Sequence, residues 1–341
     1  MKTHVYTSGQ DGYHTYRIPA LLVTKAGTLL AFCEGRRTGR GDHGDLDLLV
    51  KRSEDGGETW SEQLLIYGEP GEVTIGNPCP VVDGDTGVIW LPFCRENDDV
   101  FITHSADDGE TWADPTEITE VVKKPSWNWY ATGPGVGIQL QRGEHRGRLV
   151  IPCDHREDET YGNGSHTIYS DDHGETWQLS ALIAPGANEC QVVELSDGSL
   201  KMNIRMQTYS EGVRGISVSE DGGHNWSEVV HDANLPCPKC QAGLIGEGDR
   251  LFFSNPVSLT PVESPEAGER FYPGKGRGER ENMTVRLSED GGETWVREKL
   301  LHEGPAAYSC LTLLPDGDVG CLYEAGEEHS YQYLIFEQFR M

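Results

Sequence analysis

Short apolar runs recur along the whole chain, and each lies between clusters of glycine, proline and small polar residues. Clear examples occupy residues 46–50, 87–93, 148–152 and 333–336. Runs of this length that end in turn signals are typical of β-strands, and no long stretch keeps the apolar period of an amphipathic helix. The 42 glycines and 18 prolines supply the many turns that short strands need. The pattern therefore predicts an all-β protein in which helix is scarce.

One eight-residue pattern, Ser-x-Asp-x-Gly-x-(Thr or Asn)-Trp, occurs five times and is called the Asp box below. The copies begin at Ser53, Ser105, Ser170, Ser219 and Ser288, at intervals of 52, 65, 49 and 69 residues. Such intervals match one four-stranded blade of a β-propeller. The Asp can bond the backbone two residues on, Gly accepts a positive φ, and Trp can hold the turn against its sheet. We therefore interpret the boxes as structural, which makes their aspartates poor candidates for catalysis.

The chain is strongly acidic, because 28 Lys and Arg residues stand against 56 Asp and Glu residues, a formal net charge of −28. Nucleic acids and anionic membranes need a basic face, so the composition argues against both as partners. Most of the excess acidity is explained by solubility. A site for an anion can still exist as a local group of arginines, because salt screens remote charges beyond roughly 8–10 Å.

Strand-like sequence begins by Val5, and no apolar run reaches the ~18 residues of a membrane span. We therefore expect no signal peptide in this chain, no membrane span and a cytoplasmic location. Nine cysteines without the spacing of a disulfide framework favour reduced, mostly buried thiols. Cys237 and Cys240 form a lone CxxC pair, which is a weak signal for zinc or redox chemistry.

Candidate chemistry begins at residues 16–19, Tyr-Arg-Ile-Pro, followed by an apolar run that ends in Glu34-Gly35-Arg36. Taken alone, Arg17 is an ordinary surface arginine beside a proline. Together with the Asp boxes, however, this opening resembles the sialidase (neuraminidase) family of glycoside hydrolases, and the resemblance covers almost the whole chain. It implies a six-bladed β-propeller that forms a single catalytic domain over residues 1–341, with no cofactor and no metal.

The resemblance implies three arginines that bind the substrate carboxylate. Their positions are Arg17, Arg205 and Arg280. Sialic acid carries a carboxylate on its anomeric carbon, and guanidinium groups grip a carboxylate through paired hydrogen bonds that lysine cannot reproduce. Arg277 and Arg286 are alternatives for the third position. Glu34 matches the family's acidic residue that holds the first arginine, and Arg36 matches a further basic residue beside the substrate.

The resemblance also implies that Tyr308 is the nucleophile and that Glu189 activates it, with Glu194 as a nearby alternative for the glutamate. A neutral phenol suits this substrate, because a carboxylate nucleophile would meet the substrate's own carboxylate. The general acid and base is expected to be Asp42, on a glycine-rich loop that could place its carboxyl at the leaving oxygen. Asp45 and Asp47 lie on the same loop, which could equally be a solvated or calcium-binding turn.

Several other segments are expected to shape the pocket. Residues 77–80 and 132–135 resemble the blade-edge loops of the family, and the aromatic run 127–130 offers either a sugar-binding surface or plain blade packing. Residues 154–166 are polar and unlike a strand, so we expect them to overhang the site. Residues 261–278 read as an insertion loop at the rim.

The sequence therefore predicts a retaining exo-α-sialidase that removes terminal sialic acids from glycans, oligosaccharides or glycolipids. Transfer of the sialyl group and specificity for another nonulosonic acid such as Kdn are enzymatic alternatives. A non-catalytic glycan-binding or protein-binding propeller is an alternative from a different class. The joint presence of the arginines, Asp42, Glu189 and Tyr308 favours an enzyme, because a scaffold has no reason to keep them together.

Overall fold

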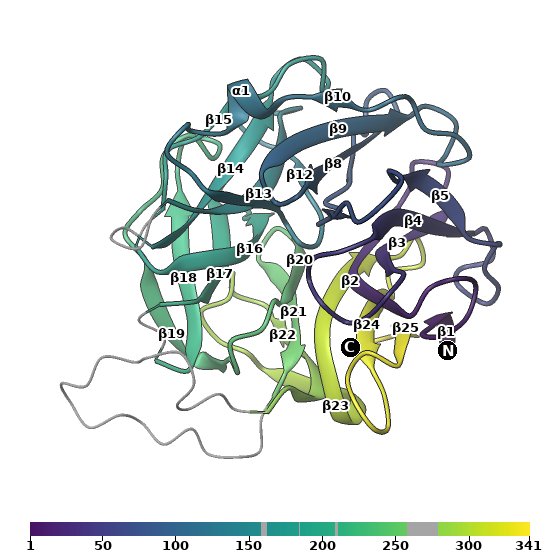
Figure 1. The fold of residues 1–341 in the computed structure, drawn as a ribbon. Coiled ribbons are helices and arrows are strands. Elements are labelled where there is room, and N and C mark those ends of the chain that lie inside the picture. The colour runs from purple at the N-terminus through teal and green to yellow at the C-terminus, as the bar shows by residue number, and fades with distance from the viewer. Residues whose placement is uncertain (158–161, 184, 209–210, 258–278) are drawn as a thin grey trace.

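A computed structural model describes residues 1–157, 162–183, 185–208, 211–257 and 279–341 of the chain. Antiparallel sheets surround a common centre, and the two chain ends lie close together (Figure 1). Helix in the described ranges is limited to one turn, α1 (Thr119–Val122), which confirms the prediction of an all-β protein. In these ranges no helix has the length and apolar character that crossing a membrane requires.

Four sheets consist of strands that follow one another in the chain. The first contains β2 (Thr15–Val23), β3 (Leu29–Arg36), β4 (Leu46–Ser53) and β5 (Leu64–Tyr67). The second contains β6 (Ile75–Gly76), β7 (Val81–Val82), β8 (Ile89–Arg95), β9 (Asp99–Ser105) and β10 (Thr116–Glu117). The third contains β11 (Trp129–Thr132), β12 (Ile138–Gln139), β13 (Leu149–Arg156), β14 (Asn163–Ser170) and β15 (Gln178–Leu179). The fourth contains β16 (Ala187–Glu194), β17 (Leu200–Met206), β18 (Val213–Ser219) and β19 (Val230–Pro236).

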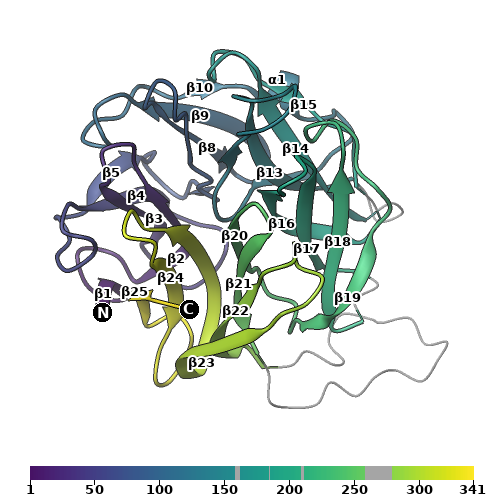
Figure 2. The same ribbon diagram turned by 180° about the vertical axis from the view of Figure 1, so that it is seen from behind.

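The fifth sheet is larger, because one long strand belongs to both of its halves. Its order is β1 (Lys2–Thr7), β25 (Tyr333–Phe339), β24 (Val319–Ala325), β23 (Arg297–Leu313), β22 (Glu281–Ser288), β21 (Arg250–Pro256) and β20 (Gly243–Glu247). Strand β23 pairs with β22 as far as Pro305 and with β24 from Ala306 onward. It curves between the two halves (Figure 2). Each half therefore has four strands when β23 is counted in both: β20 to β23 form one half, and β23, β24, β25 and β1 form the other.

Burial decreases from the centre of the molecule outward. Strands β2 and β16 are buried along almost their whole length, whereas β5, β10 and β19 are largely exposed. The buried strands are rich in Leu, Ile, Val and Ala, whose burial provides most of the favourable free energy of folding. Side chains at the ends of these inner strands can therefore be held rigidly.

Each Asp box begins at the last residue of the third strand of a four-stranded unit, where the chain turns toward the outer strand. In the first box, Ser53 Oγ donates to Asp55 at 2.8 Å, and Asp55 accepts the Thr59 amide at 2.9 Å. In each of the other four boxes, the aspartate likewise accepts the backbone amide of the residue four positions later. The prediction that the aspartate bonds the backbone two residues later was therefore wrong. Its carboxylate bonds the amide four residues later, because the turn is longer than expected. None of the five aspartates lines the pocket described below.

The Asp221→Ala variant is expected to lower stability without slowing the reaction. Asp221 accepts the Asn225 amide at 2.8 Å and the Ser219 hydroxyl at 2.9 Å, and each such bond typically contributes about 1 kcal/mol. Chemical denaturation should therefore show a lower free energy of unfolding, while the rate per folded molecule stays unchanged. Glu220→Ala, which removes the neighbouring exposed carboxylate, is the control. Normal melting with a rate lower by orders of magnitude would contradict the structural role of the box.

Candidate active site

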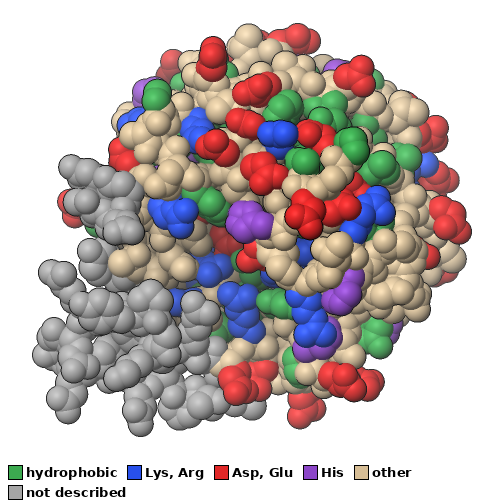
Figure 3. Space-filling view, in the orientation of Figure 1, with side chains coloured by type: hydrophobic (Ala, Val, Ile, Leu, Met, Phe, Trp, Pro, Cys, Tyr) green, Lys and Arg blue, Asp and Glu red, His purple; other side chains and the backbone are tan. Residues whose placement is uncertain are grey.

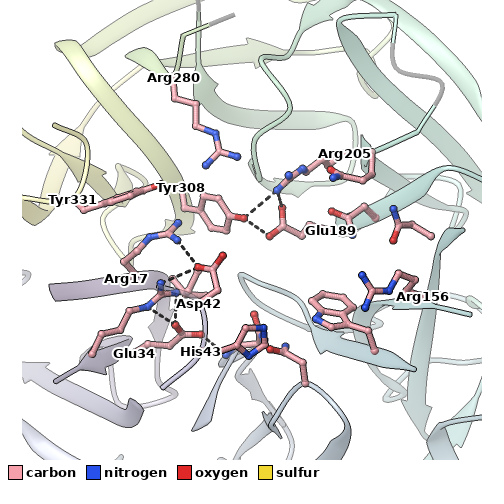
Figure 4. Close-up of a pocket in the computed structure, with 18 residues that line it drawn as sticks. Arg17, Glu34, Asp42, His43, Arg156, Glu189, Arg205, Arg280, Tyr308 and Tyr331 are labelled. Carbon is pink, nitrogen blue, oxygen red and sulfur yellow. Dashed lines mark hydrogen bonds and ion pairs between the residues drawn. The ribbon is translucent and has the colours of Figure 1, made fainter. Parts of the chain in front are cut away.

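The eight residues singled out in the sequence line one cavity of about 470 Å³. They are Arg17, Glu34, Arg36, Asp42, Glu189, Arg205, Arg280 and Tyr308. Figure 4 labels seven of them, all except Arg36, and shows these converging on the cavity from different strands and loops, although several lie far apart in the chain. On the face shown in Figure 3, Lys and Arg side chains lie around the hollowed middle, and acidic side chains lie both among them and toward the periphery. The local group of cations expected in an acidic protein is therefore present.

Irregular pairing at the ends of inner strands aims three of these side chains into the cavity. The register of β2 with β3 shifts directly after Arg17, and the registers of β16 and β23 shift in the stretches that contain Glu189 and Tyr308. A β-bulge of this kind redirects a side chain relative to a regular strand. Next to Arg17, the β-branched Ile18 has a φ of 59°, a conformation that costs roughly 1–3 kcal/mol.

Tyr308 and Glu189 form a direct pair at the bottom of the cavity. The Tyr308 hydroxyl donates to one carboxylate oxygen of Glu189, and Arg205 Nη1 donates to the other at 2.6 Å. Arg205 Nη1 also donates to the Tyr308 oxygen at 3.0 Å. Burial, followed by the charge of Glu189, raises the pKa of Tyr308 well above its ordinary value, so the phenol keeps its proton at rest. That proton already faces Glu189, which can accept it if the phenol oxygen attacks an electrophile.

Three arginines surround the ring of this tyrosine. The guanidinium carbons of Arg17 and Arg280 lie 5.0 Å and 5.7 Å from the centre of the Tyr308 ring, and Arg205 contacts its hydroxyl. A carboxylate in the cavity could therefore bind to several guanidinium groups at once. Arg286 does not line the cavity, since it pairs with Glu298 at 2.6 Å and with Asn255. The alternative Arg277 lies outside the described residues.

The carboxylate that holds Arg17 is Glu324, so the expectation that Glu34 does so was wrong. Arg17 Nε and Nη2 donate to the two oxygens of Glu324 at 3.1 Å and 3.3 Å. Glu34 instead accepts from Arg36 at 3.0 Å and 2.7 Å, because residues two apart in a strand point to the same face. Glu324 is the one charged residue in the fully buried strand β24, a signal that an arginine partner was required.

Asp42 reaches the cavity from the loop between β3 and β4. Its Oδ1 accepts from Arg17 Nη1 at 3.0 Å and from Arg36 Nη1 at 2.8 Å, although 74% of the side chain is exposed. Partial desolvation in the pocket raises the pKa of Asp42, but the charges of Arg17 and Arg36 lower it by a larger amount. The pKa of Asp42 therefore lies below its ordinary value. Asp45 and Asp47 do not line the cavity, since both pair with another arginine of the loop. Asp47 lies in strand β4, and among the described residues Asp42, Asp45 and Asp47 do not form a group that could hold a metal ion, as a calcium site would require.

The opposite wall consists of polar residues and one indole. Arg156 lies across the cavity from Arg17 and Tyr331 (Figure 4). Of the aromatic run 127–130, Trp129 lines the cavity, whereas Trp127 is buried and stacks on a histidine ring at 3.8 Å. The sequence did not single out Arg156 or Tyr331. Tyr331 lies over the Arg17 guanidinium at 4.1 Å.

The described residues of the segment 154–166 are mostly strand and not an overhanging loop, which corrects the prediction for them. Asp154 to Arg156 complete β13, and Asn163 to His166 begin β14, its antiparallel partner; residues 158–161 lie outside the description. The polar side chains misled the sequence pattern because they are buried between neighbouring strands. The Asn188 amide donates to buried Asp154 at 2.5 Å, and the Nδ1 atoms of His155 and His166 lie 3.0 Å apart.

The remaining candidates are structural. Glu194 accepts the backbone amides of Gln141 and Arg142 at 2.8 Å and 2.9 Å, away from the cavity. All nine cysteines are free and buried, as expected, and the CxxC turn is held by Arg214, which donates to the Cys240 carbonyl at 2.7 Å. Of the residues described, one group could hold a metal, and it lies outside the cavity. It consists of Asp83, Asp85 and His173.

The sheets and the site together define an all-β protein with an arginine-lined pocket that faces a tyrosine–glutamate pair. Residues 27–321 match the BNR repeat-like domain family. A sialidase of Micromonospora viridifaciens is 34% identical over 357 residues, which cover 94% of this chain and 51% of that protein. Sialidase-3 of Homo sapiens is 30% identical over 389 residues, which cover 95% of this chain and 89% of that protein.

A solved structure agrees with these relatives. The Hadza microbial sialidase Hz136 superposes with a TM-score of 0.86 at 30% identity, and the match covers all of this chain and 68% of that one. The chain therefore belongs to the sialidase family. It spans about half the length of the Micromonospora viridifaciens relative.

Proposed function

We propose that this protein is a retaining exo-α-sialidase that hydrolyses terminal α-linked sialic acids on glycans, oligosaccharides or glycolipids. The observation that carries the proposal is the convergence of three arginines on a buried tyrosine whose hydroxyl donates to Glu189. The arginines match the carboxylate that distinguishes sialic acids from ordinary sugars. The tyrosine–glutamate pair matches a nucleophile that must approach such an anion without a charge of its own.

The sheets are proposed to be six blades of one propeller domain over residues 1–341. Four blades are the first four sheets, and the two halves of the fifth sheet, which share β23, are the other two. The position of the Asp boxes supports this count, since all five occupy the same turn of their units. In this arrangement the inner strands carry Arg17, Glu189 and Tyr308 to one end of the central axis.

In the proposed mechanism, the arginines hold the carboxylate while the Tyr308 oxygen attacks the anomeric carbon. Tyr308 gives its proton to Glu189, and protonated Asp42 gives its proton to the leaving oxygen as the glycosidic bond breaks. A tyrosyl–sugar bond forms. Asp42 then accepts a proton from water, which attacks the anomeric carbon, and Glu189 returns a proton to the departing Tyr308. The two displacements retain the configuration of the sugar.

The experiment that tests the proposal measures sugar release from a panel of α2-3, α2-6 and α2-8 glycosides of Neu5Ac, Neu5Gc and Kdn, with identification of each product. Free sialic acid as the product supports hydrolysis. Preferential release of Kdn, or a product still attached to an acceptor, would replace the proposal by one of its enzymatic alternatives. Binding without release from any glycoside would show a non-catalytic propeller.

The Asp42→Ala variant is expected to lose about 10²–10⁴-fold in kcat/KM on natural glycosides and far less on aryl sialosides. Natural alcohols leave poorly without a proton, whereas a phenolate is a good leaving group. The measurement is kcat/KM for a sialyl-lactose and a nitrophenyl sialoside, since this parameter is insensitive to slow hydrolysis of the intermediate. Equal losses on both substrates would contradict the role of Asp42 as the acid.

A further inference from the structure

The backbone next to Tyr308 is held by a side chain from another segment of the chain. The register of β23 with β24 shifts between Ala306 and Ser309, in the stretch that contains Tyr308. The Ser309 amide donates to the side-chain oxygen of Gln241 at 2.9 Å, and the Gln241 side-chain nitrogen donates to the Ser309 carbonyl at 3.0 Å. One glutamine side chain therefore bonds both backbone groups of the residue that follows the tyrosine, as a neighbouring strand does in a regular sheet.

Gln241 is itself fixed inside the protein. It lies in the connection between β19 and β20, is only 1% exposed and does not line the cavity. Its side-chain nitrogen also donates to the carbonyl of Pro134 at 3.1 Å, in the connection between β11 and β12. A buried amide that lost these partners would cost free energy, so the side chain has one favoured orientation. Gln241 can therefore act as a rigid support behind the tyrosine.

A second buried glutamine bonds the same carbonyl from the strand that carries Glu189. Gln191 lies two residues after Glu189 in β16, and its side-chain nitrogen donates to the Pro134 carbonyl at 3.2 Å. Its side-chain oxygen accepts the Val136 amide at 3.2 Å, so both ends of the side chain are bonded. The backbone beside Tyr308 and the strand of Glu189 are thus connected outside the cavity through two glutamines and one carbonyl.

We propose that Gln241 is a positioning residue that sets the direction in which the Tyr308 side chain enters the cavity. This inference rests on the proposed function, in which the Tyr308 oxygen must face both Glu189 and the anomeric carbon. Gln241 acts through the backbone of Ser309 and not through contact with the sugar. A misplacement of the attacking atom by about 1 Å can cost roughly 100-fold in rate, so a support of this kind affects turnover while the arginines still bind the carboxylate.

The test compares Gln241→Met with the wild type on two substrates and one inhibitor. Methionine has a similar shape and flexibility but cannot bond an amide and a carbonyl together. We expect kcat/KM to fall ~10–100-fold, by a similar factor on sialyl-lactose and on a nitrophenyl sialoside, because both reactions need the nucleophile. The turn before Gln241, whose Lys239 carbonyl accepts from Arg280, keeps its own support because Arg214 donates to the Cys240 carbonyl at 2.7 Å. The affinity for 2,3-didehydro-sialic acid should therefore change less than about threefold.

Gln139→Met is the matched control. Gln139 also bonds two backbone segments, since its side-chain oxygen accepts the Gly84 amide at 2.8 Å and its nitrogen donates to the Gly147 carbonyl at 3.2 Å, but it lies outside the cavity. Its replacement should lower the free energy of unfolding and leave both kcat/KM values and the inhibitor affinity unchanged. A loss of turnover in Gln139→Met equal to that in Gln241→Met would overturn the inference, because the effect would then be common to any such glutamine.

A double variant separates positioning from general damage. If Gln241 acts through the Tyr308 oxygen, adding Gln241→Met to Tyr308→Phe should reduce the remaining rate by less than about threefold, because no nucleophile is left to position. A further ~10–100-fold loss in the double variant would overturn the inference, as would weaker inhibitor binding in Gln241→Met.

If Gln241→Met does not fold, Gln241→Glu serves instead. A protonated carboxyl can accept from the Ser309 amide and donate to its carbonyl, whereas the ionised form cannot donate, and burial raises the pKa of such a carboxyl. The rate relative to the wild type should therefore fall as the pH rises from about 4.5 to about 7.5. A ratio independent of pH would overturn the inference. Failure of the proposed function is separate, since the wild type would then release no sugar.

Discussion

The Tyr308→Phe variant is expected to lose at least ~10³-fold in turnover, which corresponds to about 4 kcal/mol of transition-state stabilisation. The phenol oxygen is the atom that would bond to the anomeric carbon, and phenylalanine keeps the ring that packs against Arg17 and Arg280. Binding of 2,3-didehydro-sialic acid should therefore be largely preserved, because the arginines remain in place. Steady-state rates and inhibitor affinity measured on the same preparation check both parts of the prediction.

Tyr323→Phe is the matched control for this variant. Tyr323 is also buried, and its hydroxyl also donates to a glutamate, Glu337 at 3.1 Å, but it lies outside the cavity. The control should melt at a lower temperature and retain its turnover. Nearly normal turnover in Tyr308→Phe would show that another group attacks the sugar, whereas a loss of inhibitor binding would assign Tyr308 to recognition.

The Arg280→Lys variant is expected to weaken binding of the same inhibitor by ~10–100-fold, or about 1.4–2.8 kcal/mol. Lysine keeps the positive charge but offers one nitrogen in place of a planar fork, so paired bonds to a carboxylate are lost. Inhibition constants measured as a function of salt would separate the two contributions, because the charge is unchanged and the salt dependence should be similar.

Arg286→Lys is the control on the neighbouring strand β22. Its guanidinium pairs with Glu298 and Asn255 outside the cavity, so the substitution should lower stability and leave inhibitor affinity unchanged. A reversal of these two results would exchange the roles of the two arginines. Unchanged affinity in both variants would contradict a third arginine in or directly before this strand.

The repeated and local features of the protein were predictable from the sequence, and long-range pairing was not. The Asp boxes repeat one short motif, and the resemblance to the sialidase family indicated the three arginines, which the structure brings together in one cavity. Glu324 was missed because its partner Arg17 lies 307 residues away and no local pattern connects the two. The available signal was Glu324 itself, the one charged residue in the otherwise uncharged strand β24.

Polar sequence was also a poor guide where polar side chains are buried inside the protein. Asp154, His155 and His166 belong to the segment that was predicted to overhang the site, because charge and imidazole usually mark a surface. In the structure they are buried, and the Asn188 amide and the contact between the two rings accommodate them. Hydrogen bonding between neighbouring strands made burial possible, and this information is absent from a single segment.

The bulges in β2, β16 and β23 have a consequence for how the site can change. Each provides one additional backbone residue beside a functional side chain, so the direction of that side chain depends on the number of residues in the strand as well as on its contacts. Neighbouring apolar residues could be exchanged for others of similar volume with modest effect. Deleting a single residue at any of the three bulges would instead turn the side chain toward the opposite face and remove it from the cavity.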